Sequence, residues 1–319
     1  MSTEVKYSKE LSNNMSSTTR GCPAESEQAG RASMCEGCPG QALCKSQGAE
    51  DPDQGMIDLR MNAIKHKILV LSGKGGVGKS SIATSLAIAL GLDTQKTALL
   101  DLDICGPSVP NLMGVAGQQV VSTEYGWKAL VSPHGNVKVM SVGSLLESSD
   151  SSITFRGPRK TRLIMQLIKD TFWGRLDYLI VDTPPGTSDE HLTVVKALKN
   201  TKPDGAVIVT TPQKVALGTI RKEINFCRKM GLKILGIVEN MSGYACPCCG
   251  EITDIFNSAG SVEKLCEEFK LKYLGKIPLD KHFVMCCEKG QTILKDHPET
   301  QTAEALTKLT KTIKETVSS

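Results

Sequence analysis

The sequence has neither a long hydrophobic run nor a strong charge of one sign. No window approaches the 18 or more consecutive apolar residues that a membrane-spanning helix needs, and the first residues contain no apolar leader. The formal net charge is +4, and the lysines and arginines do not gather into a basic patch. We therefore expect a soluble, cytoplasmic protein that has neither nucleic acid nor a membrane as its partner.

Residues 1–55 lack the apolar side chains that a core requires. Of Ile, Leu, Val, Phe and Trp they hold only Val5, Leu11 and Leu43, beside 11 Ser or Thr residues. Their formal charge is −3, whereas residues 56–319 carry +7, so composition and charge change at the same place. The sequence predicts a flexible N-terminal arm, residues 1–55, followed by one globular domain, residues 56–319.

From His66 onward, short apolar and β-branched runs alternate with segments of helical period. This alternation is typical of βα units around a mostly parallel sheet, a doubly wound α/β fold. The expected strands are residues 67–71, 97–102, 137–142, 178–181, 206–210, 234–238 and 273–277. The expected helices are residues 79–90, 160–172, 190–198 and 215–230, and a last helix with an apolar stripe of Leu306, Leu309, Ile313 and Val317.

A glycine-rich loop, residues 73–80 (Gly-Lys-Gly-Gly-Val-Gly-Lys-Ser), follows the first expected strand and opens the first expected helix. This setting indicates a phosphate-binding loop, whose backbone N–H groups converge on phosphate oxygens; the alternative is a glycine-rich turn that caps a helix. Lys79 is placed to reach the outer phosphates, and Ser80 to offer its hydroxyl to Mg²⁺. The residues expected to bind nucleotide are Gly73, Lys74, Gly75, Gly76, Val77, Gly78, Lys79, Ser80 and Ser81.

Lys74, a second lysine inside the loop, gives the sequence its resemblance to the deviant P-loop NTPases. The resemblance implies a face-to-face dimer in which this lysine reaches the phosphates bound by the partner subunit. Asp103 and Asp182 each follow or end an expected strand, placed to orient the attacking water and to hold Mg²⁺ through water, respectively. An aspartate in such a place is often only a turn or helix cap. The catalytic candidates are Lys74, Lys79, Asp103 and Asp182.

Asn240 is the candidate for recognition of the base. It follows a late expected strand, where members of the similar branch use the Asn amide against adenine. A guanine-binding motif of the Asn-Lys-x-Asp kind is absent from the sequence. We therefore expect ATP rather than GTP as the nucleotide.

Four of the 12 cysteines lie in the arm with the spacing C-x12-C-x2-C-x5-C. In a reducing compartment such thiols indicate a metal site rather than disulfides, and a metal centre can order a segment that has no core. Four thiolates suit Zn²⁺ or an iron-sulfur cluster, and the single close couple favours the cluster. The predicted ligands are Cys22, Cys35, Cys38 and Cys44.

Cys246 and Cys249 form a C-x2-C couple in a loop after the Asn240 strand, and no second couple follows it. In a two-fold symmetric dimer the couples of both subunits can meet and hold one bridging 4Fe-4S cluster. The alternatives are a redox disulfide and unpaired thiols. Three further cysteines, Cys105, Cys227 and Cys266, are expected to pack as small hydrophobic residues. No role is assigned to Cys248, Cys286 and Cys287.

Taken together, these motifs resemble the Mrp/nucleotide-binding-protein family of iron-sulfur cluster assembly ATPases. The resemblance rests on the loop at 73–80, Asp101 to Ser108, Arg156 to Pro158, Asp182 to Asp189, and Glu239 to Ser242 with the C-x2-C loop. With the four-cysteine arm, the chain is similar to the larger eukaryotic cytosolic scaffold subunits of that family. This implies a doubly wound fold, a deviant P-loop NTPase with a flexible metal-binding arm.

The resemblance further implies an ATPase of low turnover, a stable 4Fe-4S cluster in the arm and a labile one between two subunits. Its implied task is a scaffold that assembles clusters and transfers them to cytosolic and nuclear apoproteins. The implied partners are a homodimer mate or a smaller sibling ATPase without the arm in a heterotetramer, with recipient apoproteins and downstream assembly factors. The competing hypotheses are an ATP-driven iron-sulfur reductase and a zinc-stabilised partition or positioning ATPase.

Overall fold

The computed structural model describes residues 32–36, 41, 52–145, 157–246, 249–256 and 260–318. The chain divides into two units, residues 1–55 and residues 56–319, each with its own internal contacts. In the first unit the structure describes a short 3-10 helix, η1 (Ser33–Cys35), with Cys35 buried. The other predicted ligands of the arm, Cys22, Cys38 and Cys44, lie outside the described residues.

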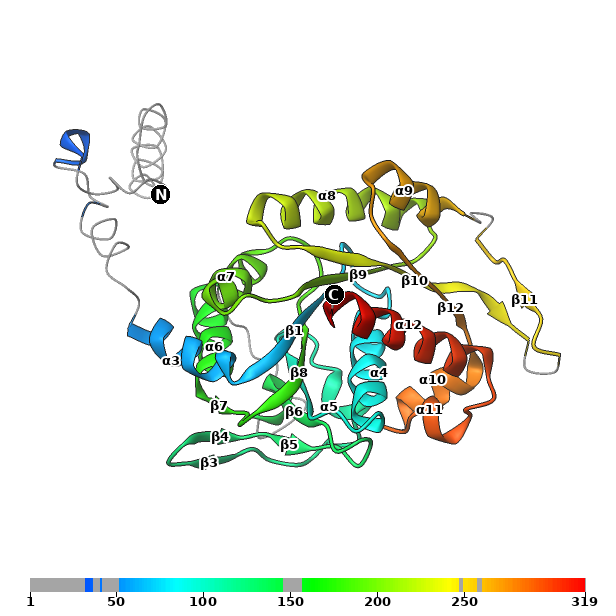
Figure 1. The fold of residues 1–319 in the computed structure, drawn as a ribbon, viewed down its shortest axis with the longest axis horizontal. Helices are drawn as coiled ribbons and strands as arrows, with labels where there is room; N and C mark the ends of the chain where they lie inside the picture. Colours follow the sequence, from blue (N-terminus) through cyan, green and yellow to red (C-terminus); the bar gives the residue numbers. More distant parts are fainter. Residues whose placement is uncertain are drawn as a thin grey trace, which may run out of the picture. The chain divides into compact units, whose positions relative to one another are not determined.

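The second unit is built on a nine-stranded sheet in which the strand order is β11-β10-β9-β1-β8-β2-β6-β5, with β12 beside β10 (Figure 1). The pairs between β12, β10, β9, β1, β8, β2 and β6 are parallel, and β11 and β5 are antiparallel to their neighbours. The strands are β1 (Ile64–Leu71), β2 (Thr97–Asp101), β5 (Leu130–Val131), β6 (Lys138–Ser141), β8 (Leu176–Asp182), β9 (Gly205–Thr210), β10 (Ile234–Ala245), β11 (Ile252–Thr253) and β12 (Tyr273–Leu279).

Helices cover both faces of this sheet and bury an apolar cluster on each (Figure 1). One face carries α3 (Pro52–Asn62), α6 (Gly157–Asp170), α7 (Asp189–Leu198), α8 (Lys214–Met230) and α9 (Ser261–Phe269). The other carries α4 (Lys79–Leu92), α5 (Val109–Leu112), α10 (Lys281–Glu288), α11 (Ile293–Asp296) and α12 (Gln301–Ser318). The predicted doubly wound, mostly parallel α/β fold is therefore confirmed.

The expected elements are present, with differences at their ends. The stripe of the last helix packs as predicted, because Leu306, Leu309 and Ile313 are buried in the core. The prediction of a helix over residues 160–172 was wrong at its end. Residues Thr171–Phe172 form a strand, β7, beside the hairpin of β3 (Val121–Thr123) and β4 (Gly126–Lys128). The Thr171 hydroxyl donates to the Leu167 carbonyl at that helix end, an interaction that periodicity does not reveal.

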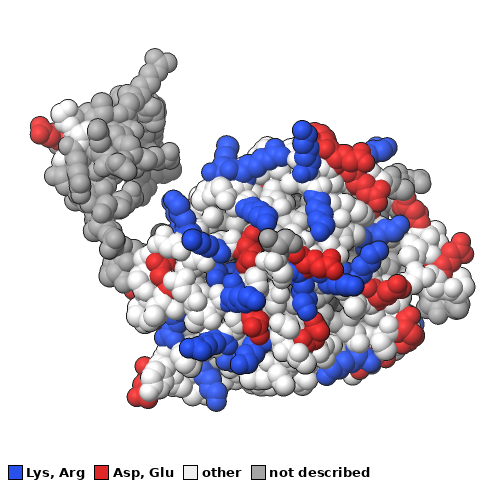
Figure 2. Space-filling view, viewed as in Figure 1, with Lys and Arg blue, Asp and Glu red and all other residues white. Residues whose placement is uncertain are grey.

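Charge of both signs is mixed over the surface that Figure 2 shows, where Lys and Arg side chains lie among Asp and Glu. On α8, for example, Arg221 pairs with Glu268 of α9. Within the described residues, no helix is both long enough and apolar enough to cross a membrane.

Glu223 of α8 is a buried acid without a partner. Its side chain has no solvent exposure, and neither carboxyl oxygen has a hydrogen-bond partner among the described residues. Burial raises the pKa of Glu223 to about 8. The folded protein therefore holds this carboxyl protonated at neutral pH, whereas the unfolded chain ionises it near its ordinary value.

Replacing Glu223 with methionine is expected to stabilise the fold. The contribution of Glu223 to wild-type stability falls as the pH rises from about 4.5 to 8, because at this site only the unfolded chain releases the proton over that window. The gain of Glu223→Met should therefore grow between pH 5 and pH 8, to at least about 1 kcal/mol. Thermal unfolding at several pH values measures it. Glu267→Met, an exposed site on α9, is the matched control, and lower stability of Glu223→Met at every pH would contradict the expectation.

Candidate functional site

The glycine-rich loop lies at the carboxyl end of the central strand β1 and leads into α4. Gly76 and Gly78 have φ of +75° and +80°, the left-handed region that favours glycine. A Cβ at Gly78 would lie 2.1 Å from the Asn240 amide nitrogen, so no larger residue fits there without displacing Asn240. Lys74, Gly75 and Gly76 are exposed. The loop therefore presents an open backbone at a helix start, the geometry that binds phosphate.

A buried ion pair lies under this loop. The Lys79 ammonium is 2.5 Å from Oδ1 of Asp182 and 3.3 Å from the Ser80 hydroxyl. Asp182 is fully buried, and its Oδ2 has no hydrogen-bond partner among the described residues. Burial raises the pKa of Asp182, and the charge of Lys79 opposes that shift. A half-satisfied carboxylate beside a serine hydroxyl is a donor set that suits Mg²⁺ and its water ligands, so the residues fit the expected metal.

Asp103 lies at the edge of the same cluster. Its Oδ2 is 4.0 Å from the Lys79 ammonium, and its side chain is 17% exposed, so solvent reaches it. Burial raises the pKa of Asp103, and Lys79 opposes this. The structure thus brings Lys79, Asp103 and Asp182 together at the ends of β1, β2 and β8.

Asp101 belongs to this cluster, although it was not among the catalytic candidates predicted from the sequence. It pairs with Asp182 across β2 and β8, accepts a hydrogen bond from the Ser141 hydroxyl (2.8 Å), and accepts one from the backbone N–H of Asp103 (3.0 Å). Burial and the neighbouring Asp182 raise the pKa of Asp101 to about 8. Asp101 thus holds the backbone of Asp103 from a position beside the buried ion pair. A sign of this role in the sequence is the Asp-x-Asp spacing at a strand end.

A small pocket of about 240 Å³ adjoins the loop on the side of β10. Gly78, Ser81, Asn240 and Met241 line it, together with Pro278 and Leu279 at the end of β12 and with side chains of α10. The Asn240 amide donates to the Val77 carbonyl at 2.9 Å, which ties this pocket to the loop. Cys287, to which the sequence assigned no role, also lines it. Recognition of adenine by Asn240 stays a prediction.

The cysteines of the core behave only partly as expected. Cys227 and Cys266 are buried, and burial raises their pKa values to about 12 and about 11. Cys105 is exposed, so the prediction that it packs as a small hydrophobic residue was wrong. It lies in the loop after Asp103, where the ammonium of Lys160 is 3.0 Å from its sulfur and 3.2 Å from Glu190. A polar contact, rather than the apolar neighbours in sequence, sets its position.

Cys246 and Cys249 lie in the turn between β10 and β11. The Cys246 N–H donates to the Glu251 carbonyl, and the Gly250 N–H donates to the Cys246 carbonyl, both at 2.9 Å. These bonds bring the two ends of the turn together; Pro247 and Cys248 lie outside the described residues. Cys249 is exposed and Cys246 half-buried. Within the described part of the chain no three ligand-type side chains cluster as a metal site would require.

The surroundings of this turn are apolar and joined to the nucleotide pocket. Tyr244, Ile252 and Ile255 are 37%, 39% and 48% exposed. They lie on the paired strands β10 and β11 and just after β11, so large apolar side chains are exposed close to the turn. The same strand, β10, carries Asn240 at the pocket and ends at Ala245, one residue before Cys246. One continuous strand therefore connects the base pocket to the cysteine turn.

A model of the family described as NUBPL iron-transfer P-loop NTPase matches residues 63–314. Among solved structures, the chain is similar to a nucleotide-binding protein of Archaeoglobus fulgidus in complex with ADP, in which Co was found by PIXE. The two sequences are 34% identical, the match covers 75% of this chain and 91% of the archaeal one, and the TM-score is 0.65.

Two cell division ATPases share the fold at lower identity. MinD of Pyrococcus furiosus is 24% identical, with a TM-score of 0.58 and coverage of 78% of this chain and 98% of its own. MinD of Pyrococcus horikoshii, solved with Mg-ADP, is 22% identical, with a TM-score of 0.56 and coverage of 77% of this chain and 94% of its own. At this identity the likeness extends to the fold alone.

Gly78→Ala is expected to abolish nucleotide binding. The added Cβ meets the Asn240 amide and is strained by the positive φ, so the loop must move away from its phosphate-binding form. Gly218→Ala, a helical glycine with open space around it, should bind nucleotide as the wild type does. Titration with a fluorescent ATP analogue measures both. Wild-type affinity in Gly78→Ala would contradict the role assigned to this contact.

Proposed function

Because the chain belongs to the family of NUBPL iron-transfer P-loop NTPases, we propose that it is an ATP-dependent scaffold that assembles 4Fe-4S clusters and transfers them to cytosolic and nuclear apoproteins. The family and the phosphate-binding loop together identify the chain as a P-loop ATPase. The cluster is cargo in this proposal, assembled on the protein and passed on.

The cysteine turn is the observation that carries the proposal. It offers two thiols at C-x2-C spacing, half of the four ligands that a 4Fe-4S cluster takes. A second copy related by a two-fold axis supplies the other two, because a symmetric interface presents the same surface from both subunits. The exposed Tyr244, Ile252 and Ile255 beside the turn supply apolar area for that contact. A site shared by two chains opens when the chains separate, which suits a cluster that must leave.

The nucleotide controls the pairing of the two subunits in this proposal. Lys74 is exposed and forms no ion pair within the described residues, so it is free to reach phosphates bound by a partner. Lys79 neutralises phosphate charge, Asp103 orients the attacking water, and Asp101 fixes the backbone of Asp103. Mg²⁺, held by Ser80 and through water by Asp182, supplies further charge neutralisation. ATP must bind the paired state more tightly than the open one to shift the population.

The arm has a separate part in the proposal. Cys22, Cys35, Cys38 and Cys44 bind a second, stable 4Fe-4S cluster, for which their spacing in the sequence is the support. The partner is a second copy or a smaller sibling ATPase without the arm. The family and the C-x2-C turn favour this function over partition or positioning, because the likeness to the MinD proteins extends to the fold alone.

Iron, sulfide and zinc analysis after anaerobic purification tests the proposal. Cys246→Ser/Cys249→Ser should lose about two irons per chain, half of a shared cluster, and Cys35→Ser/Cys38→Ser about four. Cys105→Ser removes an exposed thiol elsewhere and should keep the wild-type content. Zinc without sulfide in fresh and reconstituted wild-type protein would overturn the scaffold function.

A further inference from the structure

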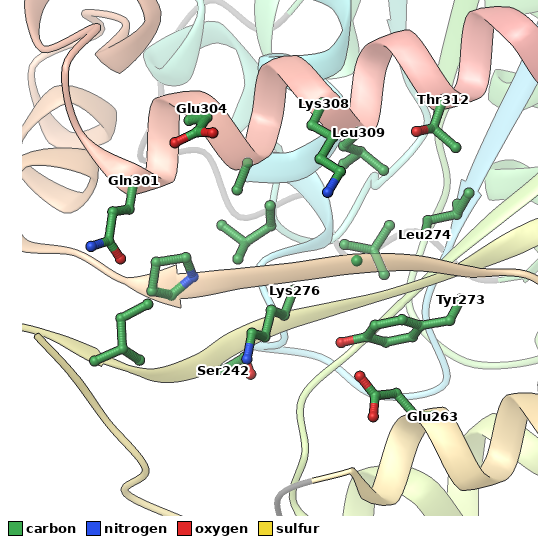
Figure 3. A pocket seen from close by; sticks show the side chains of 16 residues that line it. Ser242, Glu263, Tyr273, Leu274, Lys276, Gln301, Glu304, Lys308, Leu309 and Thr312 are labelled. Atoms are coloured by element: carbon green, nitrogen blue, oxygen red, sulfur yellow. The ribbon is translucent and has the colours of Figure 1, made fainter.

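A groove of about 660 Å³ lies between α12 and the strands at the end of the sheet (Figure 3). It shares Pro278 with the pocket beside the glycine-rich loop. Its floor consists of six consecutive residues of β12, from Tyr273 to Pro278. One wall is a single face of α12, which contributes Gln301, Glu304, Ala305, Lys308, Leu309 and Thr312. Glu263 of α9, with Val238, Ser242 and Ile252, completes the lining.

The groove follows a strand whose outer edge is open. Among the described strands, β12 pairs only with β10, so alternate backbone N–H and C=O groups along its other edge have no strand partner. Six strand residues span about 20 Å, and the eleven-residue separation along α12 spans about 16 Å. The cavity is therefore long and narrow, with the length of five or six residues of extended chain.

The groove suits the addition of one strand to β12 rather than edge-to-edge pairing with another sheet. Lys276 and Pro278 are residues that discourage pairing between the edges of two sheets. Pro278, which has no backbone N–H, is the last residue of β12 that lines the groove. The backbone N–H groups of the residues before it can still donate to an added strand. With α12 along the edge, the space suits a single added segment, the arrangement of peptides that extend a sheet.

The charges of the lining indicate what the segment carries. Figure 3 shows Lys308 and Lys276 near the middle of the groove, on opposite sides of β12, with Glu304 and Glu263 toward its two ends. None of these four groups forms an ion pair with another residue in the described parts of the chain. Lys308, which extends from α12 toward the strand, complements an acidic side chain on the same face of an added strand.

We propose that this groove binds an extended peptide segment of a recipient protein, with an acidic residue at its centre, as an added strand on β12. One end of the groove is next to the cysteine turn, because the Gln301 amide donates to the Gly250 carbonyl at 3.0 Å. A segment bound there brings its protein beside Cys246 and Cys249. The identity of the partner as a recipient rests on the proposed function, whereas the peptide binding does not.

Peptide binding to the metal-free full-length chain tests the proposal. The probe is a fluorescent heptapeptide with alternating Thr and Val and a central Glu, capped at both ends; its twin has a central Lys. We expect the Glu peptide to bind saturably below about 1 mM and more tightly than its twin. Lys308→Glu should weaken that binding at least about tenfold and favour the Lys peptide. Lys311→Glu, an exposed lysine of α12 outside the groove, is the matched control.

Hydrogen exchange on the same samples separates strand addition from surface attraction. The bound Glu peptide should slow exchange of backbone amides in β12, and equal melting temperatures of the two variants show that both are folded. No saturable binding, equal loss in both lysine variants, or unchanged exchange in β12 each overturns the proposal. Cluster content is measured separately on the wild type, so failure of the scaffold function leaves the peptide result standing.

Discussion

The ion pair between Lys79 and Asp182 is the interaction on which the rest of the site depends. It joins the first residue of α4 to the last residue of β8, and it exists because β1 and β8 are parallel neighbours whose carboxyl ends meet. Two buried charges without each other would cost several kcal/mol, so the pair also fixes the register of loop and strand. Asp182 raises the pKa of the neighbouring Asp101, so the cluster disfavours holding both negative charges. Nucleotide chemistry is thereby confined to one edge of the sheet.

The sequence predicted what local pattern determines. Residues 73–80 were recognisable because strand, glycines, Lys-Ser and helix are consecutive, and the core strands because their apolar runs are short and evenly placed. The surroundings of Glu223 and Cys105 were not predictable, because they come from helix packing or from an element 55 residues away in the chain. For Asp101 the sequence offers only the Asp-x-Asp spacing, since its Ser141 partner is 40 residues away. The antiparallel hairpin at 121–128 and β7 were missed because two- and three-residue strands carry too little periodicity.

The nucleotide pocket and the cysteine turn are connected through a single element. β10 brings Asn240 against the Val77 carbonyl and then continues to the thiols, while Gln301 of α12 holds the other side of the turn. The groove along β12 reaches the same turn. Three features that are separate in sequence thus converge on the residues that, in the proposed scaffold, hold the cargo.

The irregular middle of β10 has a mechanical consequence. Met241 and Gly243 have φ of +55° and +83°, and the pairing with β12 shifts between Asn240 and Tyr244, so the strand consists of two straight parts joined at a bend. The five steps along the strand from Met241 to Cys246 span roughly 16 Å, and turning this segment by about 10° moves its end by about 3 Å. Metal-ligand distances tolerate only about 0.2 Å. In the proposed scaffold, a very small rotation at this bend would therefore decide whether the thiol pairs of two subunits match.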